Sequence, residues 1–282
     1  MQNERRCSYL TYVVQLKQHR GTLMKKICVF NQKGGVGKTT TNINICSYLA
    51  MEGYKVLAID IDPQGNTTSG IGIDKRSLKY SMYDVLTSDV SLKDVIIQSQ
   101  VLENLYVAPS KMELAGAEVE MTMSQNREMI LKNKLISIQD EYDFIFIDCP
   151  PSLGILTINA LTSAESVLIP IQSEFYALEG VGQLINTIQL VKKSLNKSLE
   201  IEGVVMTMYD SRTNLSNEVY SEVKKYFKDK VYNTTVPRNI RLAEAPSFGL
   251  PIILYDDKCK GAEAYQDLTK EFLDRQGVKN FE

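Results

Sequence analysis

Histidine and tryptophan are nearly missing from this sequence of 282 residues: there is no tryptophan, and the only histidine is His19. With one histidine, the chain cannot build a Ser-His-Asp triad or a metal site with several histidine ligands. Cysteine is scarce, odd in number and without CxxC spacing; the five are Cys7, Cys28, Cys46, Cys149 and Cys259. This pattern argues against a disulfide framework and against a cysteine-ligated metal, and it is typical of a protein of the reducing cytoplasm.

Long apolar runs and an excess of positive charge are missing too. No stretch approaches the roughly 18 apolar residues that a membrane-spanning helix needs. The formal net charge is -2 at pH 7, so any DNA binding requires a local basic patch rather than the field of the whole molecule. The hydrophobic fraction of 44% is ordinary for a globular protein. We expect a cytoplasmic protein with a substantial core and no membrane partner.

The first 23 residues are interpreted separately from the rest. They combine Arg5 and Arg6 with the short apolar piece Tyr9–Leu16, and no clear small-residue cleavage site of a signal peptide is present. A strand-like run begins soon after Met24. We interpret residues 1–23 as an N-terminal extension that is either non-native or disordered. Residues 24–282 are expected to form a single domain, because no repeat, low-complexity tract or linker interrupts them.

From residue 26 onward, strand patterns alternate with helical ones. Continuous apolar runs predict strands buried on both faces, and apolar residues at helical spacing predict helices. The predicted strands are 27–30, 55–60, 105–108, 144–148, 167–171 and 203–208. The predicted helices are 39–52, 81–86, 92–97, 177–196, 217–227 and 262–275. This alternation predicts an α/β fold with a doubly wound, mostly parallel, twisted sheet flanked by helices.

The strongest functional signal is the glycine-rich string NQKGGVGKTT, residues 31–40, between a predicted strand and a predicted helix. Glycines let backbone N–H groups turn toward one anion, and the N-terminus of the following helix adds its dipole. In such a loop Lys38 contacts the β- and γ-phosphates, and the Thr39 hydroxyl binds Mg²⁺. The predicted nucleotide-binding residues are Lys33, Gly34, Gly35, Val36, Gly37, Lys38, Thr39 and Thr40. ATP and Mg²⁺ are therefore the expected ligands of a P-loop fold.

Two aspartates follow predicted strands, at the sheet edge where open α/β folds bind ligands. Asp148 closes the apolar run FIFID, an arrangement that holds Mg²⁺ in P-loop proteins. Asp62 lies in DIDPQGN, two residues after Asp60. Either aspartate alone could cap a turn, but beside a phosphate loop we interpret both as parts of the same site. Cys149 is interpreted as a packing residue, because residues 24–282 contain no histidine to activate it.

The loop departs from the standard G-x-x-x-x-G-K-[ST] pattern, since Gln32 takes the first glycine position and Lys33 precedes the double glycine. This deviant Walker A pattern resembles that of the ParA, MinD, ArsA and nitrogenase iron-protein group. The strings DIDPQGN, DCPPSLG, EFYALEG and PRNIRLAEAPS narrow the resemblance to Soj-type ParA partitioning ATPases. It covers the chain from about residue 25 to about residue 273.

The resemblance implies an ATPase that acts as a slow switch between a monomer and an ATP-bound homodimer. Lys33 would reach across the dimer interface to the nucleotide of the other subunit, and it would form a catalytic set with Lys38, Asp62 and Asp148. Asp62 would position the attacking water and, together with Thr39 and Asp148, serve the Mg²⁺ ion. Pro237 and Asn239 would lie near the adenine. Two weaker candidates for the adenine site are Met208 and Asp210.

The resemblance also implies partners. Arg212 and Arg241 would contact the backbone of double-stranded DNA without sequence preference, and a ParB/Spo0J-type centromere-binding protein would stimulate hydrolysis. The protein would be cytoplasmic, and nucleoid-associated when ATP-bound. The basic residues that could join such a surface are Arg212, Lys224, Lys225, Lys228, Lys230, Arg238, Arg241, Lys258 and Lys260. Acidic residues interleave with them, so an ordinary solvated face remains an alternative interpretation of these charges.

Two other functions stay open. A MinD-like membrane-positioning ATPase would end in a basic amphipathic helix, whereas residues 265–275 carry both charge signs and a narrow apolar face. An ATP-dependent metabolic enzyme on the same fold would need a substrate pocket, which the segments Gly70–Ser81 and Ser110–Gln125 could hold. The sequence does not distinguish a chromosomal from a plasmid origin.

Overall fold

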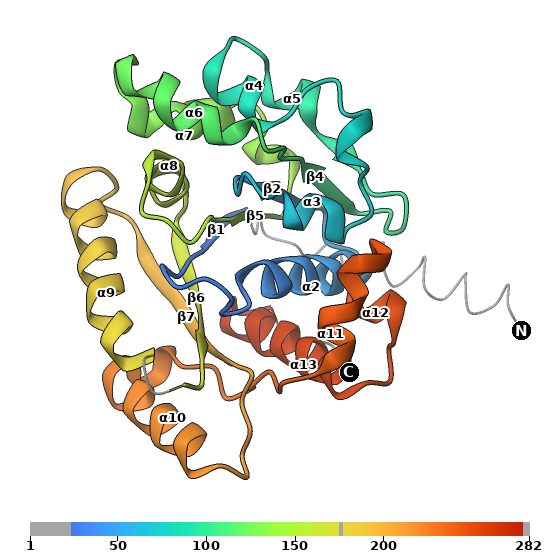
Figure 1. The fold of residues 1–282 in the computed structure, drawn as a ribbon, viewed down its shortest axis with the longest axis vertical. Helices are drawn as coiled ribbons and strands as arrows, with labels where there is room; N and C mark the ends of the chain where they lie inside the picture. Colours follow the sequence, from blue (N-terminus) through green and yellow to red (C-terminus); the bar gives the residue numbers. More distant parts are fainter. Residues whose placement is uncertain (1–23, 175–176, 279–282) are drawn as a thin grey trace, which may run out of the picture.

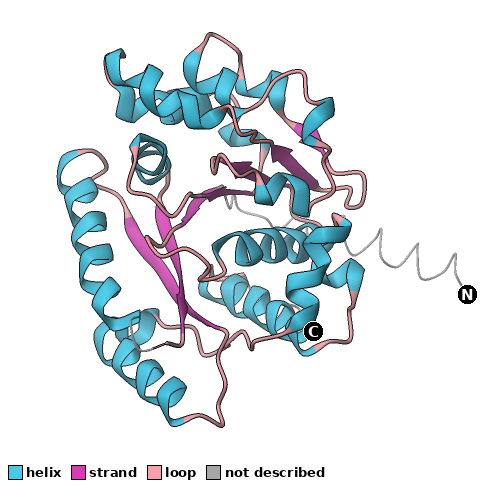
Figure 2. Ribbon diagram, in the orientation of Figure 1, coloured by secondary structure: helices cyan, strands magenta, loops and turns pink. Residues whose placement is uncertain are grey.

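The computed structural model describes residues 24–174 and 177–278, and the described residues form a seven-stranded sheet between two layers of helices (Figures 1 and 2). The proposed N-terminal extension lies outside the described residues. The strands are β1 (Lys25–Val29), β2 (Val56–Asp60), β3 (Ile97–Gln98), β4 (Leu105–Ala108), β5 (Phe144–Asp148), β6 (Ser166–Gln172) and β7 (Glu200–Thr207). Their order is β3-β4-β2-β5-β1-β6-β7, parallel throughout except for the antiparallel edge pair β3–β4. The predicted fold class is confirmed.

Helices connect the strands and cover both faces of the sheet. The longer ones are α2 (Lys38–Met51), α8 (Ile155–Ser163), α9 (Ala177–Ser194), α10 (Asn214–Phe227) and α13 (Lys260–Arg275). The shorter ones are α3 (Asn66–Gly70), α4 (Met82–Thr87), α5 (Leu92–Val95), α6 (Leu114–Glu120), α7 (Ile130–Leu135), α11 (Ile240–Glu244) and α12 (Ile252–Tyr255). Single 3₁₀ turns occupy Lys75–Ser77, Met121–Met123, Arg127–Met129, Gln139–Glu141, Lys228–Lys230 and Ala245–Phe248.

The alternation of side chains along each strand explains the two helical layers. In β5, Phe144 and Phe146 pack against α2 and α13, whereas Ile145 and Ile147 belong to the cluster formed with α4–α10. Successive strand residues point to opposite faces, and all five residues of β5 are buried. A continuous apolar run is therefore the sequence pattern that this central strand requires. Figure 1 shows α2, α11, α12 and α13 together on one side, with α8, α9 and α10 on the other.

One predicted element changes its type along its length. The sequence pattern predicted a helix over residues 92–97, but α5 ends at Val95 and residues 97–98 form the edge strand β3. The backbone N–H of Ser99 donates to the carbonyl of Leu105, 2.8 Å away, which closes a tight connection to β4. The β-branched residues Ile96 and Ile97 suit this extended conformation better than a helix.

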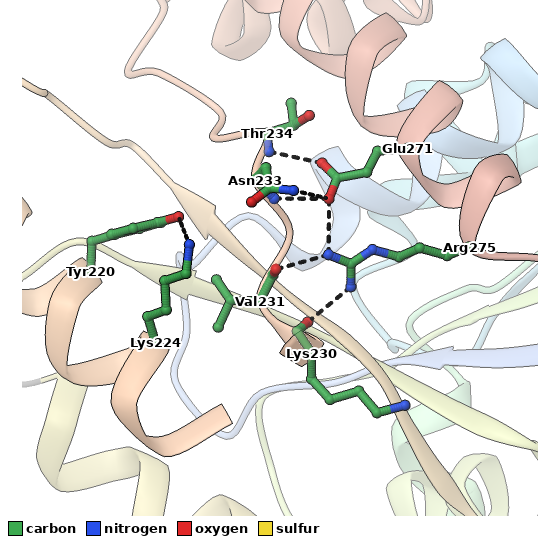
Figure 3. A network of polar contacts seen from close by, with 8 residues as sticks. All are labelled: Tyr220, Lys224, Lys230, Val231, Asn233, Thr234, Glu271 and Arg275. Atoms are coloured by element: carbon green, nitrogen blue, oxygen red, sulfur yellow. Dashed lines mark hydrogen bonds and ion pairs between the residues drawn. The ribbon is translucent and has the colours of Figure 1, made fainter. Parts of the chain in front are cut away.

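The C-terminal helix packs on the core through its apolar face. Tyr265, Leu268 and Phe272 are fully or almost fully buried against α2 and the central strands. Its polar side holds the segment that follows α10, as Figure 3 shows: Glu271 accepts hydrogen bonds from the backbone N–H groups of Asn233 and Thr234, both 2.9 Å long. Arg275, in turn, donates to the carbonyls of residues 230 and 231. This network fixes the start of the segment that leads to Pro237.

Candidate nucleotide site

The phosphate loop lies where β1 gives way to α2, between strands β5 and β6 that flank β1 in the sheet. This is the switch point at which open α/β sheets bind ligands. Gly35 and Gly37 have φ angles of 73° and 89°, values that residues with a Cβ rarely adopt. A Cβ added at Gly34 or Gly35 would meet no atom within 4 Å, so the backbone there is open to an anion. The N-terminus of α2 faces the same space.

Two side chains, Asn31 and Thr207, fix this loop to the neighbouring strands. Asn31 donates from Nδ2 to the Pro170 carbonyl at 2.8 Å, and its Oδ1 accepts the backbone N–H of Lys33 at 3.0 Å. Thr207, the last residue of β7, donates from Oγ1 to the Val36 carbonyl at 2.8 Å. A loop anchored in this way is preorganised to bind phosphate.

The two lysines of the loop take different positions. Lys38 is buried and donates from Nζ to the Lys33 carbonyl at 2.8 Å. Burial lowers the pKa of Lys38, and the charges of Asp148 and Asp62 partly oppose that effect. Lys33 is half-buried, and its side chain extends toward α9, where an ideal Cβ at Gly180 would be 4.0 Å from its Cε. Lys38 is thus enclosed, while the side chain of Lys33 lies at the rim of the loop.

Two carboxylates end adjacent strands side by side. Asp60 of β2 pairs in register with Asp148 of β5, and both are fully buried. Burial raises the pKa of both carboxyl groups, and the charge of Asp148 raises that of Asp60 further. The short helix α3 supplies a threonine to each: Thr67 donates to Asp148 at 2.8 Å, and Thr68 donates to Asp60 at 2.7 Å. Asp60 is therefore a structural partner of α3.

Asp148 retains an oxygen atom that no side chain satisfies. Its Oδ1 is buried without a hydrogen-bond partner, while Thr67 donates to Oδ2 at 2.8 Å. The hydroxyl groups of Thr67 and the nearby Thr39 partly offset the rise in the pKa of Asp148 that burial causes. Within the described residues, no group of three or more His, Cys, Asp or Glu side chains could hold a metal by itself. A hydroxyl, one carboxylate and the oxygens of a phosphate fit Mg²⁺, which keeps several water ligands in such sites. The residues present therefore suit Mg²⁺ bound together with a nucleotide.

Asp62 follows β2 on a braced turn. Its Oδ1 accepts the backbone N–H of Gln64 at 2.9 Å, and its carbonyl accepts that of Gly65 at 2.8 Å. Gly65 has a φ of 62°, and an added Cβ would lie 2.8 Å from the Ser110 carbonyl, so this turn requires glycine. Asp62 is close enough for its charge to act on both Lys38 and Asp148.

A pocket of about 180 Å³ adjoins the loop on the side of β7. Of the predicted adenine contacts, Met208, Pro237 and Asn239 all line it, and Met208 has a strained φ of 50°. The complete lining is Gly37, Thr40, Thr207, Met208, Val236, Pro237, Arg238, Asn239, Leu242, Ala243 and Tyr265. Asp210, by contrast, lines the neighbouring groove and binds Arg212 through both carboxylate oxygens.

The two predicted DNA contacts lie on different elements. Arg212 precedes α10, and its side chain is 87% exposed although it is paired with Asp210 at 2.8 Å. Arg241 lies in α11, half exposed, with ion pairs to Glu244 at 2.9 Å and Asp256 at 3.3 Å. Both guanidinium groups are accessible, and each would have to share or exchange its carboxylate partner to bind a phosphate.

Sequence reasoning missed several residues of the site. Thr67 and Thr68 escaped notice, although a threonine pair directly after DIDPQGN is a usable signal for hydroxyls near the aspartates. Thr207 is the polar end of an otherwise apolar strand. Tyr265 gives no local signal, because its hydroxyl meets Thr41 at 3.0 Å only through the packing of α13 on α2.

A phosphate loop at the switch point of a parallel sheet, with a buried aspartate and a threonine beside it, defines a P-loop ATPase domain. The AAA domain family model matches residues 24–201. The Bacillus subtilis sporulation initiation inhibitor protein Soj is 57% identical over 247 residues, 88% of this chain and 97% of that protein. The Myxococcus xanthus chromosome partitioning protein ParA is 49% identical over 259 residues, 92% and 91% of the two chains. The chain belongs to the ParA/Soj family of chromosome-partitioning ATPases.

A solved structure relates the site to nucleotide binding. It is described as cobyrinic acid a,c-diamide synthase from Mycobacterium smegmatis with a bound ATP analogue and magnesium. It superposes with a TM-score of 0.77 at 37% identity, covering 88% of this chain and 93% of that one. Magnesium and an ATP analogue therefore occur together on a closely similar fold. Within the described part of this chain, no helix is both long and apolar enough to cross a membrane.

Proposed function

We propose that this protein is an ATP-driven partitioning switch. ATP closes a homodimer, the dimer binds double-stranded DNA without sequence preference, and hydrolysis releases it. A ParB/Spo0J-type centromere-binding protein stimulates the hydrolysis, and the protein is cytoplasmic and nucleoid-associated while ATP-bound. The observation that carries the proposal is the unpaired Oδ1 of Asp148 beside Thr39 and Lys38. The names of the relatives, Soj and the chromosome partitioning protein ParA, support the partitioning role.

Each residue of the site has a separate role in ATP hydrolysis. The amides of residues 34–40 and the Lys38 ammonium bind the phosphates, and Thr39 with Asp148 hold Mg²⁺, which supplies charge neutralisation when bound. Asp62 orients the attacking water from its fixed turn. Lys33 leaves its place against α9 and brings a second cation to the γ-phosphate of the other subunit. A cation delivered in trans couples the chemistry to dimer formation.

The adenine base and the DNA bind on the side of the phosphate loop that faces β7. Met208, Pro237 and Asn239 surround the adenine in the 180 Å³ pocket. Asn239 Oδ1 already accepts the backbone N–H of Arg241 at 2.8 Å, which leaves its amide N–H group to donate to the base. The same residue thus connects the nucleotide pocket to α11, where Arg241 faces solvent. Two copies of Arg212 and Arg241 in a dimer would bind DNA far more tightly than one.

Alanine at Arg212 or Arg241 is expected to weaken binding of the ATP-bound protein to random-sequence duplexes at least about tenfold, equally for all sequences. Each change should also reduce the salt dependence of the binding constant, because phosphate contacts are lost. Arg76→Ala is a matched control, since Arg76 and Asp74 form the same exposed bidentate pair as Arg212 and Asp210. Fluorescence anisotropy across a salt series measures both quantities. Equal affinities for all three variants would remove these arginines from the interface.

The alternatives make different predictions. A MinD-like positioning ATPase would use its C-terminal helix on membranes, but the apolar face of α13 packs on the sheet in this structure. The likeness to a protein described as a cobyrinic acid a,c-diamide synthase favours testing a metabolic function. Turnover that depends on a small-molecule acceptor, without DNA binding, would support that second function.

A further inference from the structure

A hydrogen-bonded chain of three side chains leads from α2 to the carboxylate at the end of β5. Asn42 donates from Nδ2 to the Thr67 hydroxyl at 3.2 Å, and Thr67 donates from Oγ1 to Oδ2 of Asp148 at 2.8 Å. All three residues are fully buried. They come from α2, α3 and β5, and α3 packs against α2 (Figure 1). Buried polar side chains that bond one another across separate elements make the arrangement of those elements rigid.

The Thr67 hydroxyl has a single proton, and Asn42 determines where that proton points. An amide N–H group can only donate, so the bond from Asn42 makes Thr67 Oγ1 the acceptor on that side and directs its proton to Asp148. Hydroxyl groups in helices often donate instead to the carbonyl four residues back, as Ser69 of α3 does to Gly65 at 3.0 Å. Asn42 therefore favours the bond from Thr67 to the carboxylate over this local alternative.

The neighbouring threonine of α3 makes a contact that is structural only. Thr68 donates to Oδ2 of Asp60 from both its hydroxyl and its backbone N–H group, at 2.7 and 2.8 Å. Oδ1 of Asp60 accepts the backbone N–H of Asp62 at 3.2 Å, so both oxygens of that carboxylate have partners. In Asp148, by contrast, Oδ1 is buried with no partner among the described residues. The bond from Thr67 thus holds one oxygen of Asp148 and leaves the other for a ligand.

Helix α3 also begins directly after the turn that carries Asp62. The Asp62 carbonyl accepts the backbone N–H of Gly65 at 2.8 Å, and α3 starts at Asn66. Thr67 is therefore in the first turn of the helix that follows Asp62. Its bond connects the residue proposed to orient the attacking water with the carboxylate proposed to hold Mg²⁺.

We propose that Thr67 is a positioning residue for the metal site and that Asn42 acts through it. Thr67 holds Oδ2 of Asp148, so that Oδ1 stays available to Mg²⁺ or to its bound water, and Asn42 keeps the Thr67 proton on the carboxylate. Removing a side chain that bonds a metal ligand from behind typically lowers metal affinity about 10- to 100-fold. This inference rests on the proposed function in one respect: Asp148 serves the Mg²⁺ ion of the nucleotide site.

The test measures the affinity of the full chain for a fluorescent ATP analogue, N-methylanthraniloyl-ATP, across a Mg²⁺ series and in EDTA. Thr67→Val should raise the Mg²⁺ concentration that gives half-maximal enhancement of binding at least about tenfold. The weaker binding in EDTA should not change, because the phosphate loop and the base pocket are intact. Thr67→Ala should give the same shift without adding an apolar branch, whereas Thr67→Ser keeps the hydroxyl and should stay close to wild type.

Thr68→Val is the matched control for the loss of a buried hydroxyl from α3. It removes the same chemical group from the adjacent residue, but that group bonds Asp60. Denaturant unfolding should show a loss of stability in this variant, while its Mg²⁺ requirement should equal that of the wild type. An equal shift of the Mg²⁺ requirement in Thr68→Val and Thr67→Val would assign the effect to α3 as a whole and would overturn the proposal.

A double-mutant cycle tests the role of Asn42. Asn42→Leu should shift the Mg²⁺ requirement in the same direction as Thr67→Val but by less, because the Thr67 hydroxyl remains. In the Thr67→Val background, Asn42→Leu should have no further effect on the Mg²⁺ requirement. The same loss in both backgrounds would show that Asn42 acts independently of Thr67 and would overturn its part in the proposal.

The remaining outcomes distinguish this proposal from the proposed function. If the wild type requires Mg²⁺ for tight binding and folded Thr67→Val shows no shift, or weakens equally with Mg²⁺ and in EDTA, the positioning role is wrong and the metal site stands. If the wild type binds the analogue equally well with Mg²⁺ and in EDTA, the metal site of the proposed function is wrong as well. DNA binding does not enter the measurement, so a protein that never binds DNA can still confirm or contradict the role of Thr67.

Discussion

Asp148→Asn is expected to lower ATP hydrolysis at least about a hundredfold and, at the same time, to stabilise the nucleotide-free protein. Asparagine keeps the shape and can still accept the hydrogen bond from Thr67, but it provides no negative charge for Mg²⁺. The wild-type carboxylate is fully buried beside Asp60, and one of its oxygens is unpaired. Removing that charge should raise the free energy of unfolding by about 1–2 kcal/mol. Steady-state phosphate release and denaturant unfolding measure the two effects.

The control for this prediction is Asp143, a carboxylate at the opposite end of β5 from Asp148. Asp143 precedes β5 and accepts the backbone N–H of Lys55 at 2.7 Å, far from the phosphate loop. Asp143→Asn should leave hydrolysis unchanged and should not stabilise the protein. If Asp148→Asn hydrolysed ATP normally, the proposed metal site would be wrong. If it hydrolysed slowly but also unfolded more easily, the unpaired oxygen of Asp148 would not destabilise the nucleotide-free protein.

Lys33→Ala is expected to abolish stimulated hydrolysis, with a loss of about a hundredfold or more, while ATP still binds. Lys38 and the loop amides remain in this variant, and the Lys33 carbonyl still accepts from Lys38. Only the Lys33 side chain, which extends toward α9, is removed. Action in trans makes a sharper prediction for a mixture. Lys33→Ala supplies an intact Asp62, and Asp62→Ala supplies an intact Lys33, so a mixed dimer contains one competent site.

An equal mixture of the two inactive variants should therefore recover about one quarter of the wild-type rate, since half of the dimers are mixed and each has one working site. Lys193→Ala, which removes an exposed lysine of α9, should behave as wild type alone and in mixtures. A mixture that stays inactive, although sedimentation shows mixed dimers, would place the action of Lys33 within its own subunit.

The central strands and the phosphate loop could be predicted from the sequence because their signals are local. FIFID is apolar on both faces, and NQKGGVGKTT needs its glycines within the loop itself. The short helices α3, α6, α7, α11 and α12 were not predicted, since so few residues give at most a weak periodic pattern. Helix α8 was not predicted either, because it is buried on nearly all sides and shows no polar face. Their positions follow from packing against distant segments.

The partners of the site residues show the same limit. Thr207 binds the Val36 carbonyl across 171 residues, and Thr67 binds Asp148 across 81. No spacing rule connects such pairs, because the topology of the sheet brings them together. The motif identified the charged residues and Thr39, whereas the pairing of Thr67 and Thr207 with their distant partners is visible only in the folded chain. A sequence position near the site also does not fix the direction of a side chain. Asp210, a predicted adenine contact, binds Arg212 in the neighbouring groove.

The most direct test of the ATP-driven switch is the affinity for a random-sequence DNA duplex in three states: without nucleotide, with ADP, and with ATP and Mg²⁺. Wild type and Asp62→Ala are compared by fluorescence anisotropy at several salt concentrations. We expect binding only with ATP and Mg²⁺, stronger in Asp62→Ala because the ATP-bound dimer persists, and steeply weakened by salt. Binding that is equal in all three states, or absent from all of them in both proteins, would contradict it.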